Sequence, residues 1–175
     1  TAQAAFLDEI FKASSSILNA LLTILNERKY HNGTTSTDVP LIGLIGASNE
    51  LPTGESELSA LYDRFLIRCF VDYVEANQLY QFFDITPPSY LLNHLSRDDI
   101  DQIHQKAANA VFPKEVQEAV YKIWADHNEA FKENSDETLS DRRFVKVINL
   151  MKISAATNDR NNVDFSDVFL LKDCL

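Results

Sequence analysis

The sequence predicts an α/β layer over residues 1–85, followed by an all-helical domain over residues 86–175. In the first half, short apolar runs alternate with helical patterns, which is typical of a mostly parallel sheet. The pair Pro87-Pro88 cannot continue a helix, and only helical patterns follow it. A chain of 175 residues with 45% hydrophobic content is long enough to bury a core, in one domain or two small ones.

The elements of the α/β half follow one another closely. The run AAFL at residues 4–7 is interpreted as a short buried strand, and leucines at helical spacing follow up to Arg28. Asn32-Gly33 predicts a β-hairpin. The apolar run at residues 39–48 is typical of a central strand buried on both faces. Further along, the patterns predict a helix at residues 55–65, a strand at residues 66–73 (LIRCFVDY) and a helix at residues 75–83.

Capping residues mark the helices of the second half. Pro113 suits the first turn of a helix whose apolar residues recur at helical spacing. Ser140 can cap a second helix, and Asp164 or Ser166 can begin a last one that reaches Leu171. The second half is therefore expected to contain no sheet.

Composition excludes several classes of function. The net charge of −10 argues against a broad nucleic-acid surface, because affinity for phosphates rests largely on Lys and Arg. Cys69 and Cys174 stand far apart and form no CxxC motif, which suits a reducing cytoplasm. No apolar stretch has the length of a membrane span, and the N-terminus carries no signal-peptide pattern. We therefore expect a cytoplasmic protein with neither a nucleic-acid partner nor a membrane span.

Two adjacent carboxylates, Asp8 and Glu9, end the first apolar run. Sheets of this class place their sites beyond the carboxyl ends of the strands. There, one carboxylate can hold Mg²⁺ while its neighbour polarises an attacking water. The alternative is that Asp8 only caps the helix that follows. The pair by itself leaves both interpretations open.

Asn49 and two arginines are further candidates. Asn49 follows the apolar run at residues 39–48, where an amide can orient water near a phosphate, although Asn is also an ordinary loop starter. Arg64 and Arg68 flank a helix-to-strand turn. An arginine supplied by a neighbouring subunit can stabilise a transferring phosphoryl group, but Asp63 offers a simple salt bridge instead.

Arg142 and Arg143 stand in the first turn of the helix expected after Ser140. The helix dipole favours anions at this end, so each cation there costs about 0.3–1 kcal/mol. Cations that stand against the helix dipole in this way often mark a functional site, although the charge of Asp141 can offset part of the electrostatic cost. The four histidines and two cysteines show no metal-ligand spacing, and the serines lack a G-x-S-x-G turn.

The order of these signals resembles the AAA+ ATPases: a strand ending in Asp-Glu, a strand ending in Asn, an arginine turn, and a helical domain with arginine at a helix start. The similarity is closest to the MoxR branch, in particular to its RavA-like members, and it is strongest over residues 5–70 and 139–175. The segments that carry it are FLDEIFKASSSILNALLTILNERKYHNG, PLIGLIGASNELP, ALYDRFLIR, LSDRRF and FLLKDCL. The implied fold is part of a P-loop NTPase core with a mostly parallel sheet, followed by a helical lid.

The resemblance implies a role for each residue near the strand ends. Asp8 and Glu9 would be the Walker B pair of an ATP-hydrolysing site, with Asp8 serving Mg²⁺ and Glu9 activating the hydrolytic water. Asn49 would be sensor 1, close to the γ-phosphate and to that water.

The resemblance also implies an assembly. Arg64, with Arg68 as the alternative, would be the arginine finger that reaches into the neighbouring subunit's site. Arg142, with Arg143 as the alternative, would be sensor 2 and would contact the phosphates from the lid. A finger donated in this way needs a head-to-tail interface, which closes as a ring, here a hexamer. Hydrolysis would drive remodelling of a protein client, together with a von Willebrand A-domain protein.

The sequence departs from the family pattern at one point. The Walker A loop, G-x-x-x-x-G-K-[ST], is absent, since none of the four glycines is followed by Lys. The chain does not begin with Met, and its last residues, VFLLKDCL, form an apolar pattern without a helix cap. We therefore expect a piece of a longer protein whose nucleotide clamp lies upstream of Thr1. The alternatives are a non-enzymatic acidic interaction scaffold and a carboxylate metal site without nucleotide.

The isolated chain is expected to bind ATP weakly or not at all. The missing loop supplies the backbone N–H groups and the Lys that hold the phosphates in this class of site. Equilibrium titration with a labelled ATP analogue measures this affinity, and a micromolar dissociation constant would contradict the prediction.

Overall fold

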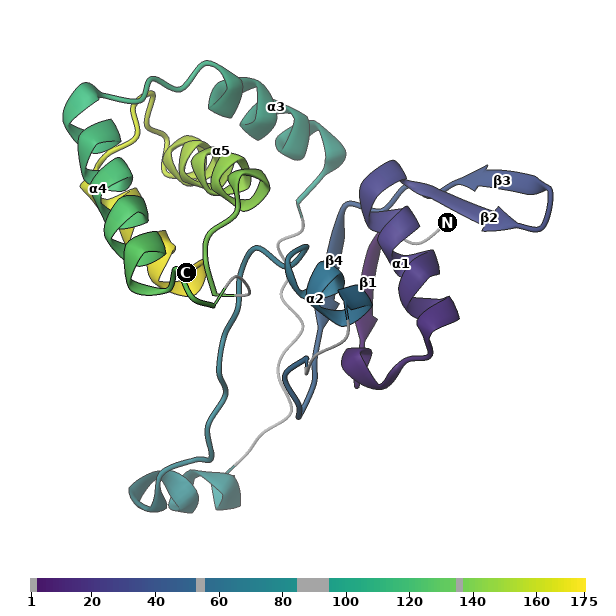
Figure 1. Cartoon of the computed structure of the whole chain (residues 1–175). Helices are drawn as coiled ribbons and strands as arrows, with labels where there is room; N and C mark the ends of the chain where they lie inside the picture. Colours follow the sequence, from purple (N-terminus) through teal and green to yellow (C-terminus); the bar gives the residue numbers. More distant parts are fainter. Residues whose placement is uncertain (1–2, 53–55, 85–94, 135–136) are drawn as a thin grey trace. The chain divides into compact units, whose positions relative to one another are not determined.

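The structure is a computed structural model, and it describes residues 3–52, 56–84, 95–134 and 137–175. Two compact units make up the chain, residues 1–66 and 67–175. The first contains strands and helices, and the second is helical (Figure 1). The predicted fold class, an α/β part with a parallel sheet followed by a helical part, is confirmed. The domain boundary after residue 85 adjoins residues outside the described ranges and stays a prediction.

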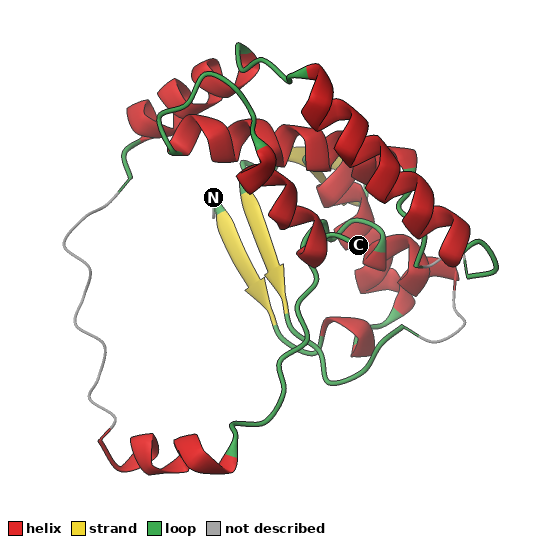
Figure 2. Cartoon of the chain, turned by 90° about the vertical axis from the view of Figure 1, so that its left-hand side faces the viewer, coloured by secondary structure: helices red, strands yellow, loops and turns green. Residues whose placement is uncertain are grey.

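A two-stranded parallel sheet organises the first unit. Strand β1 (Ala4–Leu7) pairs with β4 (Gly43–Gly46), and Leu7 lies opposite Gly46 in the register. The elements between them in the chain are α1 (Ser15–Glu27) and the antiparallel hairpin of β2 (Lys29–Asn32) and β3 (Thr35–Asp38). Helix α2 (Ser56–Tyr62) follows β4. Figure 2 shows both strands of the sheet pointing the same way, so their carboxyl ends meet at one edge.

One face of this sheet carries the core of the first unit. Its buried residues are Ile10, Leu18, Leu58 and Leu61. On the other face Phe6 and Ile45, which are register partners, remain 64% and 66% exposed. The expectation of a strand buried on both faces at residues 39–48 is therefore wrong for this chain, and residues 4–7 form the predicted strand but not a buried one. The ladder covers only Gly43–Gly46, and no described residues cover the second face.

One other local prediction needs correction, and two are confirmed with a difference in detail. Residues 66–73, predicted as a strand, pair with no described strand, and Phe70, Val71 and Tyr73 are exposed. A strand depends on hydrogen bonds to a partner, so propensity alone does not form one. The helix predicted at residues 75–83 forms as a 3₁₀ helix, η2 (Ala76–Asp84). The predicted hairpin is confirmed, and its turn is formed by Gly33-Thr34, with Gly33 at a φ of 61°.

The helices of the second unit begin at residues that the sequence marks. These elements are α3 (Arg97–Ala108), α4 (Lys114–Ala130), α5 (Asp141–Thr157), α6 (Phe165–Val168) and the 3₁₀ helix η3 (Phe169–Asp173). Ser140 and Asp164 cap α5 and α6 as predicted, while Pro113 is the N-cap of α4 and not a first-turn residue. Pro87-Pro88 lies outside the described residues. Within the part of the chain that the structure describes, no helix is both long and apolar enough to cross a bilayer.

A buried ion pair joins the residues after α5 to α6. Arg160 donates to both carboxylate oxygens of Asp167, each at 2.7 Å, and Asp167 is only 1% exposed. The Asp164 N–H donates to the same carboxylate at 3.0 Å. Burial acts to raise the pKa of Asp167, but the hydrogen bonds from Arg160 and Ser154 outweigh it, so the pKa lies below its usual value.

Asp167→Asn is expected to lower the free energy of unfolding by about 2 kcal/mol at neutral pH, because it removes the buried one of the two carboxylates that pair with Arg160 and leaves only Asp164. A carboxyl group whose pKa is lowered by folding contributes stability above its unfolded pKa, and loses that contribution as the pH falls through the folded pKa. The difference between variant and wild type should therefore shrink below about pH 4.

Denaturant unfolding measured across this pH range tests the prediction. Asp126→Asn, which changes an exposed carboxylate on α4, is the matched control and should have little effect. A destabilisation by Asp167→Asn that is the same at acidic and at neutral pH would contradict the prediction.

Candidate active site

The loops that follow β1 and β4 are held together by backbone hydrogen bonds. The Ala47 N–H donates to the Leu7 carbonyl at 2.8 Å, and the Ile10 N–H donates to the Ala47 carbonyl at 3.1 Å. These bonds continue the parallel ladder beyond the last paired strand residues. The buried side chain of Ile10 anchors the first loop in the core. As a result, the residues that follow Leu7 and Ala47 lie side by side.

Glu9 adopts a left-handed backbone conformation in the first of these loops. Its φ of 52° and ψ of 40° are uncommon for a residue with a side chain and cost roughly 1–2 kcal/mol. Such strain persists only where the surrounding structure dictates the backbone. Here the ladder bond at Leu7 on one side and the buried Ile10 on the other fix the turn.

The structure brings together three residues that the sequence predicts as one site. The Asn49 Nδ2 donates to the Glu9 Oε1 at 3.1 Å, although 40 positions separate the two residues. Asp8 is exposed beside them, and its Oδ1 accepts a hydrogen bond from the Glu9 N–H at 3.0 Å. A carboxylate pair and an amide therefore meet at the carboxyl edge of the parallel sheet, where sites of this fold class lie.

Lys12 is a neighbour of this cluster that the sequence-based prediction missed. Its Nζ lies 3.2 Å from the Glu9 Oε2 and 3.8 Å from the Glu50 Oε1. The hydrogen bond and the charge of Glu9, followed by the charge of Glu50, raise the pKa of Lys12. The available signal was the spacing of three residues between Glu9 and Lys12, which places both on one side of a helical turn.

Arg64 lies at the end of α2 in the same unit. Its Nε donates to the Asn26 Oδ1 at 3.0 Å, and its Nη1 donates to the Ala60 carbonyl at 2.8 Å. The following residue, Phe65, packs against the end of β4. A Cβ on Gly46 would lie 3.0 Å from the Phe65 ring, so a larger residue there would fit only if this ring shifted by a few tenths of an ångström. The turn that carries Arg64 is thereby fixed against the strand that leads to Asn49.

The adjacent arginines at the start of α5 have different surroundings. Arg143 is fully buried, and it donates to the Cys174 carbonyl and, at 3.5 Å, to the Thr138 carbonyl. Arg142 is exposed. Arg143 therefore ties the last residues of the chain to α5, while Arg142 is accessible from solvent. Arg68, the other arginine candidate, also belongs to the second unit. Its backbone N–H donates to the Asp173 carbonyl at 2.7 Å.

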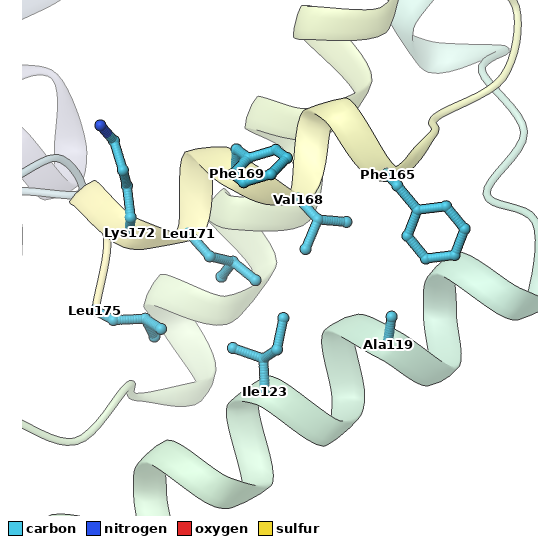
Figure 3. A pocket seen from close by; sticks show the side chains of 8 residues that line it. All are labelled: Ala119, Ile123, Phe165, Val168, Phe169, Leu171, Lys172 and Leu175. Carbon is cyan, nitrogen blue, oxygen red and sulfur yellow. The ribbon is translucent and has the colours of Figure 1, made fainter.

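The second unit also contains an apolar pocket of about 500 Å³ between α4 and the C-terminal helices (Figure 3). Its lining residues are Ala119, Ile123, Phe165, Val168, Phe169, Leu171, Lys172 and Leu175. Of these, Lys172 alone carries a charge, and its amine points away from the pocket in Figure 3. A pocket without converging polar groups offers neither an acid–base pair nor a phosphate ligand. The candidate active site therefore remains the sheet edge at Glu9 and Asn49.

The carboxylates at this edge fit Mg²⁺ that arrives with a nucleotide. Mg²⁺ is usually held by one or two carboxylates together with phosphate oxygens and water. Asp8 offers one exposed carboxylate of this kind. Among the described residues, no group of three His, Cys, Asp or Glu side chains could hold a metal ion. The alternative of a metal site without nucleotide therefore gains no support.

Comparisons with known proteins first define the class. A solved structure, described as that of a candidate ATPase from Cytophaga hutchinsonii, matches with a TM-score of 0.73 over 99% of this chain and 57% of that chain, at 16% identity. A family model for the AAA lid domain matches residues 115–175. The chain therefore has the AAA+ ATPase fold with a helical lid.

The particular family follows from a second match. The model for the MoxR domain in the MoxR–vWA–β-propeller ternary systems matches residues 1–110, and the chain belongs to this family. Two uncharacterized proteins of Methanocaldococcus jannaschii are each 40% identical over 173 residues, which cover 98% of this chain and 44% of theirs. A structural protein of Acidianus two-tailed virus is 35% identical over 71 residues, 41% of this chain and 12% of its own length. The chain thus spans less than half the length of its M. jannaschii relatives.

Arg143→Met is expected to lower the free energy of unfolding by about 3 kcal/mol, because it removes the donor to two carbonyl groups in buried surroundings. Arg142→Met, one residue away on the exposed side, is expected to change it by less than about 0.5 kcal/mol. Denaturant unfolding of both variants and of the wild type measures the difference between the two changes in the free energy of unfolding. Equal effects would show that the two arginines do not differ in structural role.

Proposed function

We propose that the protein to which this chain belongs hydrolyses ATP in a Mg²⁺-dependent reaction at the sheet edge formed by Asp8, Glu9 and Asn49. The contact between the Asn49 Nδ2 and the Glu9 Oε1, at 3.1 Å, carries this proposal. A carboxylate and an amide in contact, each at the end of a parallel strand, can orient and deprotonate one water beside a phosphate. The MoxR family match supports the same reaction.

Glu9 is the general base in this proposal. Its side chain is 37% exposed, although its Oε2 is buried, and the neighbouring residues restrict its orientation. Asn49 would position the water, and Asp8 would hold the metal ion. Bound Mg²⁺ would neutralise charge on the phosphates. The phosphate-gripping loop would come from a part of the protein other than this chain, since the glycines here lack the Lys of that loop.

The arginines complete the proposed site. We assign sensor 2 to Arg142, because Arg143 is buried and bound to carbonyl groups. We assign the arginine finger to Arg64, with Arg68 as the alternative; Arg64 would exchange its bond to Asn26 for a phosphate of the neighbouring subunit. A finger supplied in trans requires a head-to-tail ring, for which we propose a hexamer.

The partners are proposed from the family description. That description places the MoxR domain in ternary systems with vWA and β-propeller components. We propose that the intact protein is RavA-like and remodels a protein client together with a von Willebrand A-domain partner. The two free cysteines, Cys69 and Cys174, support a location in the cytoplasm.

In the full-length protein, Glu9→Gln is expected to lower ATP turnover by about 100-fold or more, because the amide cannot accept the proton of the attacking water. Binding of a labelled ATP analogue should be retained. Phosphate release and equilibrium titration measure the two effects separately, with Glu118→Gln on the exposed side of α4 as the control. Turnover unchanged by Glu9→Gln would remove Glu9 from the mechanism, whereas no ATP turnover in the wild-type full-length protein would favour the non-enzymatic scaffold.

A further inference from the structure

Lys12 contacts the candidate site but has no role in the function proposed above. It ends the short 3₁₀ helix η1 (Ile10–Lys12), and its N–H donates to the Glu9 carbonyl at 2.9 Å. This single turn brings the Lys12 side chain back to Glu9, where its Nζ lies 3.2 Å from Oε2. The turn is fixed by the buried Ile10 within it.

Both carboxylate oxygens of Glu9 are thereby engaged, each by a different loop. Oε1 accepts the hydrogen bond from Asn49, which follows β4, and Oε2 faces the ammonium of Lys12, which follows β1. Lys12 also approaches the Glu50 Oε1 at 3.8 Å, next to Asn49 in the chain. One cation therefore links the two loops where they carry the residues of the proposed site.

We propose that Lys12 is a positioning residue for Glu9. Together with Asn49 it forms a clasp, defined as the Lys12–Glu9–Asn49 contacts, that fixes the direction of the Glu9 carboxylate. The consequence for catalysis rests on the proposed ATPase function, whereas the clasp can be tested on this chain without it. A general base acts only when it is held close to its productive geometry, within about 0.5 Å. An ion pair this exposed contributes little to folding stability, so its effect should be on orientation.

The charge of Lys12 persists over the pH range in which such an enzyme works. Because its pKa is raised by Glu9, the ammonium form is fully present at neutral pH. The attraction between the Lys12 ammonium and the Glu9 carboxylate is lost only as the pH rises through the raised pKa of Lys12. Loss of the clasp in an otherwise folded protein is therefore expected at strongly alkaline pH.

The first experiment measures the clasp directly. The side-chain amide of Asn49 is followed by ¹⁵N NMR in this chain and assigned with Asn49→Ser. Lys12→Met, which keeps most of the side-chain length and removes the charge, should move this resonance toward its position in Glu9→Ala. Lys12→Arg should keep it near the wild-type position. Lys132→Met is the matched control, because it breaks an exposed Lys–Glu pair of the same spacing with Glu129 on α4. An Asn49 resonance that is the same in Lys12→Met as in wild type overturns the proposal.

The second experiment measures the consequence in the full-length protein. Lys12→Met should lower kcat for ATP hydrolysis about tenfold or more while changing KM by less than about twofold, since it disturbs the base and not the nucleotide contacts. Lys12→Arg should recover most of the activity. If Glu9→Gln abolishes turnover and Lys12→Met leaves it intact, the positioning role is wrong and the proposed function stands. If Glu9→Gln has no effect, the proposed function fails, and the NMR result still decides whether the clasp exists.

Discussion

The parallel pairing of β1 with β4 is the constraint on which the first unit depends. Because the strands run in the same direction, the chain must cross over between them, here through α1 and the hairpin, and both carboxyl ends then share one edge. The ladder continues through Ala47, which bonds to Leu7 and to Ile10. This leaves Glu9 in a tight left-handed turn directly opposite the loop that carries Asn49. A change of register would move every side chain of a strand relative to the core.

Stability and chemistry are carried by different residues in this molecule. Polar contacts of the buried Arg143, and the pair that Arg160 forms with the buried Asp167, hold the helical unit together. The residues of the proposed site are half-buried or exposed and contact one another by single polar interactions. This division suits a site that must admit water and a nucleotide, because fully buried polar groups are costly to rearrange.

Each of the two units also leaves apolar surface uncovered in this chain. Phe6 and Ile45 form an exposed pair on one face of the sheet, and Phe70, Val71 and Tyr73 are exposed without a strand partner among the described residues. Soluble proteins seldom expose such groups together unless another surface covers them. These features agree with the head-to-tail ring proposed above, in which a neighbouring subunit could cover such surface.

The sequence by itself determined the fold class, because hydrophobic spacing and capping residues are local signals: Ser140 and Asp164 begin their helices as expected, and AAFL forms its strand. It also marked Asp8, Glu9 and Asn49, since polar residues at strand ends stand out against apolar runs. Only the tertiary structure decided that Glu9 touches Asn49, that Lys12 joins them, and that Arg143 is buried while Arg142 is not. It also decided that residues 66–73 form no strand. Each of these facts depends on which distant segment lies opposite, and local sequence carries little information about that.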